Sequence, residues 1–396
     1  METLKQKPTA ALGGWAPLAL GFRPFFLLAV FAAVLLVAAW PFVWRGRLVP
    51  PVQYDPVAWH AHEMLFGYVA AVIAGFLLTA VRNWTGVPTW TGTRLGMLAL
   101  VWLAGRLLPW LPGVPPALVV AVDVAFLPLL ALGLARPLWR GQNRVNRVFL
   151  PLLLAMALAN LLSHLQLLGL VSGLGDMRRV MLDLVLGLVA LVAGRVMPFF
   201  TQNVLPGFRP AVRPWVERTT LVSVVLLVLG EGSGLVPAAP MALLWLLFGA
   251  SQAVRLAGWS DRRVSSIPVL WVLHLGYAWL VLGALLTGLA GFGLFPANAA
   301  LHALTLGGIG GFTLGMMARV ARGHTGRPID VTRSTVLAFV AVNLAALARV
   351  FGTAWAGAAY AHWIDLSGAL WVLGFALFAW RYLPMLLRVR VDGRPG

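Results

Sequence analysis

Two segments of the chain carry, in the same order, the same residues of types that are energetically unfavourable in a membrane helix. Residues 62–88 read HEMLFGYVAAVIAGFLLTAVRNWTGVP, and residues 302–328 read HALTLGGIGGFTLGMMARVARGHTGRP. Aligned without a gap, 240 residues apart (302 minus 62), both have a histidine, two glycines in the apolar stretch, an arginine and a closing Thr-Gly-x-Pro. Histidine and arginine are expensive in lipid and glycine is unfavourable in a helix, so chance rarely repeats them together. The repeat predicts a histidine site built from two helices.

Histidine must carry any tight transition-metal ligation in this chain. The sequence has seven histidines and no cysteine, which excludes disulfides, thiolate metal sites and iron–sulfur clusters. A lone histidine near a helix end is usually interfacial or hydrogen-bonded, but several at one depth favour ligation. The candidate metal ligands are His60, His62, His164, His302 and His362. Of these, His62 and His302 are the expected axial ligands of a haem on facing helices, and His60 is expected to bind a second metal or haem.

Helical geometry separates His60 from His62. Successive residues of an α-helix turn by about 100°, so the two imidazoles point about 200° apart and cannot share one centre. They are therefore expected to serve different centres. The alternative is that the turn after Pro56 is frayed, which would let the two rings converge.

The composition is that of an all-α, polytopic membrane protein. Of the 396 residues, 60% are hydrophobic and 11% charged, and the mean hydropathy is +0.87. Apolar runs of the about 20 residues that cross a bilayer recur along the chain, so we predict about 12 transmembrane helices in a single integral membrane domain, residues 1–396. The first, preceded by Lys5 and Lys7, has no cleavage site after it and is read as a retained helix. The predicted spans start near Pro24, Trp59, Leu95, Pro116, Val148, Val180, Val216, Met241, Ile267, Asn298, Val331 and Tyr360.

The net charge of +18 reflects topology and not nucleic-acid binding. The arginines form no basic arm but gather in the loops after every second span, and the loops after spans three, seven, nine and eleven have essentially none. The positive-inside rule then places both termini in the cytoplasm. The five candidate histidines fall in the outer half of their helices.

Four charged residues are expected at the same outer depth. Glu63 and Asp183 are the candidate catalytic, proton-handling groups, and Glu63 could also orient a histidine N–H. Arg106 and Arg349 could pair haem propionates or form ion pairs with carboxylates. The glycines of the repeat either let helices approach closely or make room for a flat macrocycle.

Four motifs resemble the NnrS family. They are GFRPFFLLA at residues 21–29, WHAHEM at residues 59–64, GRVMPFFTQN at residues 194–203 and the segment that starts at His302. The resemblance covers almost the whole chain. It implies a bacterial inner-membrane protein that contains haem, here expected as haem b, and copper, and that is associated with denitrification and resistance to nitric oxide.

A looser likeness is to the catalytic subunit of haem-copper oxidases and nitric oxide reductases. That subunit has three pseudo-repeats of four spans, with haem-binding histidines in spans two and ten. Its second span is similar in order to His60, Met64, Gly75, Phe76, Asn83 and Trp84. Spans six and seven of this chain lack histidine, so the oxidase-type copper centre cannot be carried over.

These observations favour a haem protein of the inner membrane that binds nitric oxide or a related small ligand. It would consume the ligand, with an electron donor as partner, or relay electrons, or signal its presence. The first alternative is a transporter, since ionisable residues and Gly-interrupted helices also mark substrate pathways. The second is a non-catalytic protein that protects iron enzymes from nitrosylation.

Overall fold

The computed structural model describes residues 14–51 and 54–394, and within them every regular element is helical. Lys5 and Lys7, which precede the first predicted span, lie outside these residues. π-Helical turns at Glu63–Val69, Ala303–Gly310 and Ala348–Gly352 continue α2, α11 and α13. The α-helices are α1 (Phe22–Trp44), α2 (Pro56–His62), α3 (Ala70–Thr85), α4 (Gly92–Leu107), α5 (Pro116–Arg140), α6 (Phe149–Leu167), α7 (Met177–Val204), α8 (Pro214–Ser233), α9 (Ala238–Trp259), α10 (Pro268–Gly291), α11 (Ala297–His302), α12 (Gly311–His324), α13 (Arg333–Leu347) and α14 (Tyr360–Leu387).

The predicted fold class is confirmed. With α2–α3 and α11–α12 each taken as one continuous helix, the 14 α-helices make 12 rods, and ten of them are long and apolar enough to cross a membrane. The other two are α4, which has 16 residues, and α8, which carries Glu217, Arg218 and Glu231. The chain is a multi-pass membrane protein.

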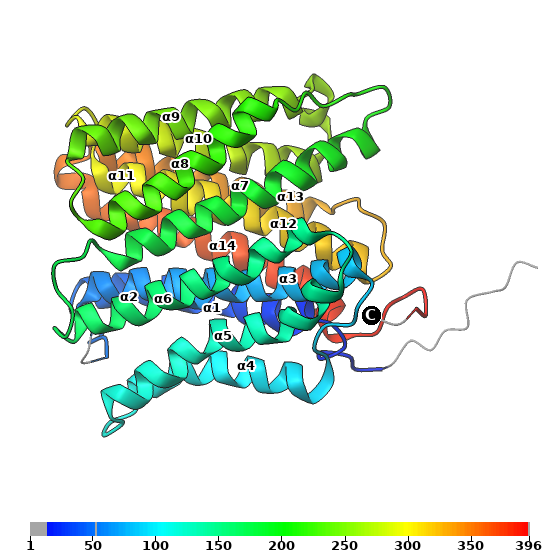
Figure 1. Ribbon diagram of the computed structural model, residues 1–396, viewed down its shortest axis with the longest axis horizontal. Helices are drawn as coiled ribbons and strands as arrows, with labels where there is room; N and C mark the ends of the chain where they lie inside the picture. Colours follow the sequence, from blue (N-terminus) through cyan, green and yellow to red (C-terminus); the bar gives the residue numbers. More distant parts are fainter. Residues whose placement is uncertain (1–13, 52–53, 395–396) are drawn as a thin grey trace, which may run out of the picture.

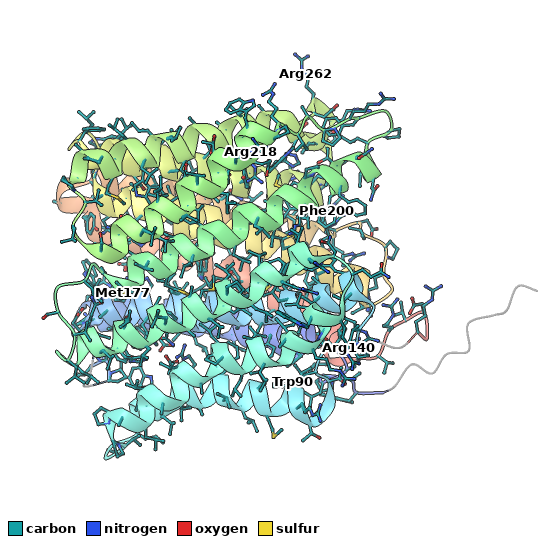
Figure 2. The ribbon with its side chains drawn as sticks, in the orientation of Figure 1. Trp90, Arg140, Met177, Phe200, Arg218 and Arg262 are labelled. Carbon is teal, nitrogen blue, oxygen red and sulfur yellow. The ribbon has the colours of Figure 1, made fainter. Side chains whose placement is uncertain are left out.

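The rods run alongside one another, and the two ends of the described chain meet (Figure 1). Trp15 pairs with Arg388, α1 lies against α14, and Arg23 donates hydrogen bonds to the carbonyls of Met385 and Leu386 at the end of α14. We call the end where α2 and α11 begin the histidine end, and the end where α3, α5 and α12 finish the arginine end. Met177 lies at the first, and Arg140 and Arg262 lie at the second (Figure 2).

The two repeat segments have the same local structure. In each, an α-helix ends at the histidine, a π-helical turn follows, and an α-helix continues to the Thr-Gly pair. Thr85 and Thr325 donate to the carbonyls four residues earlier, and both following glycines have positive φ, 68° at Gly86 and 75° at Gly326. Glycine is favoured there because a Cβ would be strained in the left-handed region. The Tyr68 hydroxyl lies 2.6 Å from that of Thr313, so the two segments touch.

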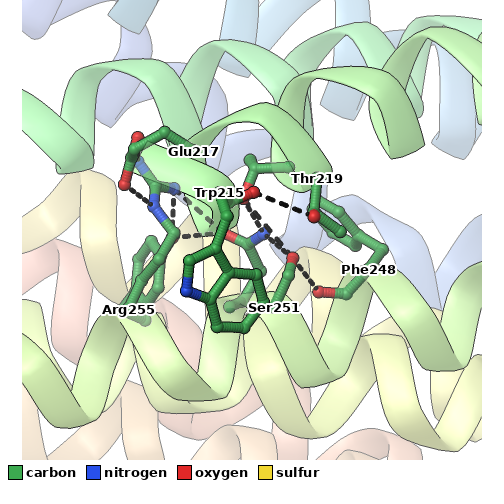
Figure 3. Close-up of polar contacts among 9 residues, drawn as sticks. Trp215, Glu217, Thr219, Phe248, Ser251 and Arg255 are labelled. Carbon is green, nitrogen blue, oxygen red and sulfur yellow. Dashed lines mark hydrogen bonds and ion pairs between the residues drawn. The ribbon is translucent and has the colours of Figure 1, made fainter. Parts of the chain in front are cut away.

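A buried polar network binds α8, α9 and α10 together (Figure 3). Both carboxylate oxygens of Glu217 accept from Arg255 at 2.9 Å, and Arg255 also donates to Gln252 and to the hydroxyl of Tyr277. Gly194 on α7 makes room for this guanidinium, because a Cβ there would lie 2.1 Å from its Nη2 atom. With its main acceptors supplied from three helices, Arg255 acts as a structural clamp.

Replacing Arg255 is expected to destabilise the fold strongly. Arg255→Ala leaves Gln252 and the Tyr277 hydroxyl short of a buried partner and should lower the free energy of unfolding by about 3 kcal/mol. Glu217→Gln should cost only about 1 kcal/mol, because the Glu217 side chain is 38% exposed. Denaturation of the purified protein in detergent measures both, and equal losses would contradict the clamp.

Candidate functional site

A buried polar cluster lies between α2, α4, α5 and α6 at the histidine end. All of its side chains are at most 8% exposed. Sites of this kind are rare at membrane depth, because each polar group removed from water must find a partner inside the protein. The members of this buried polar cluster are His62, Glu63, Arg106, Asp123, Asn160 and His164.

Asp123 is the centre of the buried polar cluster. Its Oδ2 atom lies 2.9 Å from Nε2 of His164, 3.2 Å from Nε2 of His62 and 2.9 Å from the Asn160 amide nitrogen, which donates to it. Its Oδ1 atom accepts from Arg106. One carboxylate therefore joins α2, α4 and α6 to α5.

Local sequence signals hold the histidine and glutamate in place. The Asp55 side chain accepts from the backbone N–H groups of residues 57 and 58 and Pro56 occupies the first turn, so α2 starts as a regular capped helix. His60 and His62 consequently point to different neighbours. The π-helical turn that follows places Glu63 3.4 Å from Nε of Arg106.

Two glycines give the charged groups of the cluster their space. A Cβ on Gly67 would lie 3.1 Å from Nη1 of Arg106, and one on Gly105 would lie 2.9 Å from Oδ1 of Asp123. In the second repeat Gly307, the counterpart of Gly67, makes room for an aromatic ring instead, because a Cβ there would lie 2.6 Å from the ring of Trp279. The repeat glycines therefore serve close packing.

The charges of the buried polar cluster favour an additional cation. With both carboxylates ionised, Glu63 and Asp123 outnumber the single guanidinium of Arg106 by one. One ligand atom each from His62, Asp123 and His164 lies within 4.8 Å of the others, close enough to converge on one metal ion. Two imidazoles and a carboxylate suit copper, iron or zinc.

A second group, which we call the histidine pair, consists of His60 on α2 and His302 at the end of α11. His60 stacks on Trp40 of α1 with 4.4 Å between ring centroids, and lies within electrostatic range of His302. Nδ1 of His302 is 2.7 Å from the carbonyl oxygen of Asn298 and donates to it, so its Nε2 keeps a lone pair. Nδ1 of His60 has no hydrogen-bond partner among the described residues. Each ring thus has a nitrogen available as a ligand.

Arg349 accompanies the histidine pair. It lies within electrostatic range of both rings, donates to the Thr353 hydroxyl and sits over the ring of Tyr360. Among residues 14–51 and 54–394 it has no carboxylate partner, whereas Arg106 has two. A positive charge beside two ligand-capable imidazoles suits an anionic group such as a propionate.

The remaining candidates lie outside both groups. His362 is exposed on the first turn of α14. Asp183 is buried on α7, in electrostatic range of Glu231, and its Oδ2 atom has no hydrogen-bond partner within the described part of the chain. His274 is a structural histidine, since its two ring nitrogens face the backbone carbonyls of Leu270 and Trp259.

Sequence reasoning missed Asp123, Asn160 and Tyr54. Asp123 and Asn160 are isolated polar residues inside predicted spans, a signal that could have found them. Tyr54 carries no such signal; its ring lies 5.2 Å from that of His62 and 6.2 Å from that of His164. Burial, reinforced by the negative charge of Glu63, raises the pKa of Tyr54. The Tyr54 hydroxyl therefore stays neutral beside the buried polar cluster.

The family model described as NnrS protein matches residues 16–390, nearly the whole chain. The chain belongs to the NnrS family. Family membership makes this a membrane protein associated with the nitric oxide response, as its motifs predicted. No curated protein matches the sequence of this NnrS-family member.

The central role of Asp123 predicts a large loss of stability on its removal. Asp123→Ala leaves the guanidinium of Arg106 with Glu63 alone and should lower the free energy of unfolding by about 4 kcal/mol. Asp365→Asn is the matched control, because Asp365 pairs with Arg45 at an exposed site and should cost less than about 1 kcal/mol. Denaturation in detergent compares the two, and a similar small loss for both would refute the role of Asp123.

Proposed function

We propose that this NnrS-family protein binds nitric oxide or a related small ligand at a metal centre and takes part in nitric oxide detoxification. The observation that carries the proposal is the buried polar cluster, in which two histidines and an aspartate converge inside a membrane protein of this family. The arginine-rich loops support an inner-membrane location with both termini in the cytoplasm.

His62, His164 and Asp123 are the proposed ligands of a transition metal, with copper as the first candidate. Glu63, whose Oε1 atom lies 3.7 Å from Nδ1 of His62, is the carboxylate placed to orient that imidazole. Arg106 fixes Asp123 from the opposite side and limits the negative charge of the site. The metal, when bound, supplies a Lewis acid for a small ligand.

His302 and His60 are the proposed ligands of haem b. The donor set fits, because each presents an imidazole nitrogen that has no hydrogen-bond partner among the described residues and could bind a metal. Arg349 would pair a propionate. Haem iron, when bound, would supply a place for an electron from a donor protein and, where nitric oxide replaces one of the two imidazoles, a site for that ligand. His60 and His62 lie two residues apart on α2, so one helix would hold a ligand of each centre.

Metal content tests the role of the buried polar cluster. Wild-type protein loaded with copper, iron or zinc should hold about one ion per chain at this site, and His62→Ala or His164→Ala should weaken binding more than about tenfold. His362→Ala is the control, because His362 is exposed and belongs to neither group. Plasma mass spectrometry of each variant gives the stoichiometry. Metal binding that survives both cluster substitutions would contradict the assignment of His62 and His164 as ligands.

Absorption spectra, with and without nitric oxide, test the histidine pair. The wild type, reduced and oxidised, should show a Soret band that shifts with nitric oxide, and His302→Ala should lose or shift it. His274→Gln should leave it unchanged, because His274 is bound to backbone carbonyls. If His62→Ala and not His302→Ala removed the band, haem would belong to the buried polar cluster instead.

A further inference from the structure

Arg319 on α12 is a buried guanidinium, and no carboxylate pairs with it in the part of the chain that the structure describes. Its side chain is 8% exposed, and its Cζ atom lies 3.6 Å from the centroid of the Phe200 ring on α7. Its Nη1 atom has no hydrogen-bond partner among the residues that the structure describes. Neither metal-ligand group includes it.

Two other buried arginines and one partly buried arginine have acceptors supplied by the protein. Arg255 is paired with Glu217, Arg106 with Asp123, and Arg195 donates to the side-chain oxygen of Asn146 at 2.7 Å. For Arg319 the face of Phe200 provides only a cation–π attraction, which is weaker than the penalty for removing an ion from water. The surroundings of Arg319 are therefore incomplete without an anion.

The position of Arg319 indicates where the anion comes from. Arg319 precedes His324, the last residue of α12, by five residues (324 minus 319), which places it about 7.5 Å from the arginine end. Phe200 lies in that part of the molecule (Figure 2), and its neighbour Phe199 is 59% exposed. An exposed aromatic side chain on a membrane-spanning helix faces lipid, so the lipid-facing surface of α7 begins one residue from the ring that Arg319 contacts.

We propose that Arg319 and Phe200 form a phosphate-binding site between α12 and α7 at the arginine end. The guanidinium donates two parallel hydrogen bonds to phosphate oxygens, the geometry for which arginine is suited. The Phe200 ring packs against the guanidinium and limits its rotation. A lipid headgroup is the natural source of this phosphate, and inorganic phosphate has the same chemistry. The site is independent of the proposed metal centres.

Lipid retention tests the phosphate site. After exhaustive detergent exchange, wild-type protein should keep about one more phospholipid per chain than Arg319→Gln, and Arg319→Lys should keep an intermediate amount. Arg195→Gln is the matched control and should retain lipid like the wild type, because Arg195 already has Asn146 as acceptor. Native mass spectrometry counts the bound lipid, and equal retention by wild type and Arg319→Gln would overturn the proposal.

Thermal stability of the wild type gives a second measurement that needs no variant. Delipidated protein should melt at a higher temperature with phosphatidylglycerol than with diacylglycerol, which lacks the phosphate. Stabilisation by inorganic phosphate but not by phosphatidylglycerol would identify free phosphate as the ligand of the same site. No stabilisation by either would contradict the site.

Discussion

The ion pair between Asp123 and Arg106 is the interaction on which the candidate site depends. The carboxylate also faces His62, His164 and Asn160, so it fixes three neighbouring helices relative to α5. A membrane interior offers no water to replace any of these partners. The helices can therefore pack here only in an arrangement that brings all the donors to one acceptor. That arrangement also brings the imidazoles of His62 and His164 close enough together to bind one metal ion.

The same constraint separates structural from functional polar residues elsewhere. Arg255 and Arg23 have acceptors supplied by the protein, a carboxylate for one and the carbonyls at the end of α14 for the other. These groups hold helices together. Arg349 and Arg319 have no carboxylate partner within the described residues, and each lies where a small anion would complete its surroundings. Incomplete polar groups, and not buried polar groups in general, mark the candidate binding sites.

The repeat has one local structure and two environments. Each segment ends an α-helix at its histidine and continues through a π-helical turn, a feature frequent at functional sites. The next residue differs, Glu63 in the first copy and Ala303 in the second. Only the first copy therefore has a carboxylate at this position, and that carboxylate forms an ion pair with Arg106. His62 lies with His164 in the buried polar cluster, and His302 lies with His60 beside Arg349.

Hydropathy along the chain is enough to predict the helical membrane fold and ten of the spans, and four motifs are enough to predict the family, because both are local patterns of residues. The sequence also separated His60 from His62, since the turn of a helix depends only on spacing. Which histidines meet was decided by tertiary structure. Asp123 joins His62 from a helix about 60 residues away (123 minus 62 is 61), and His164 arrives from another. Such pairings depend on which helix faces pack together, and the spacing of residues along the chain does not specify those faces.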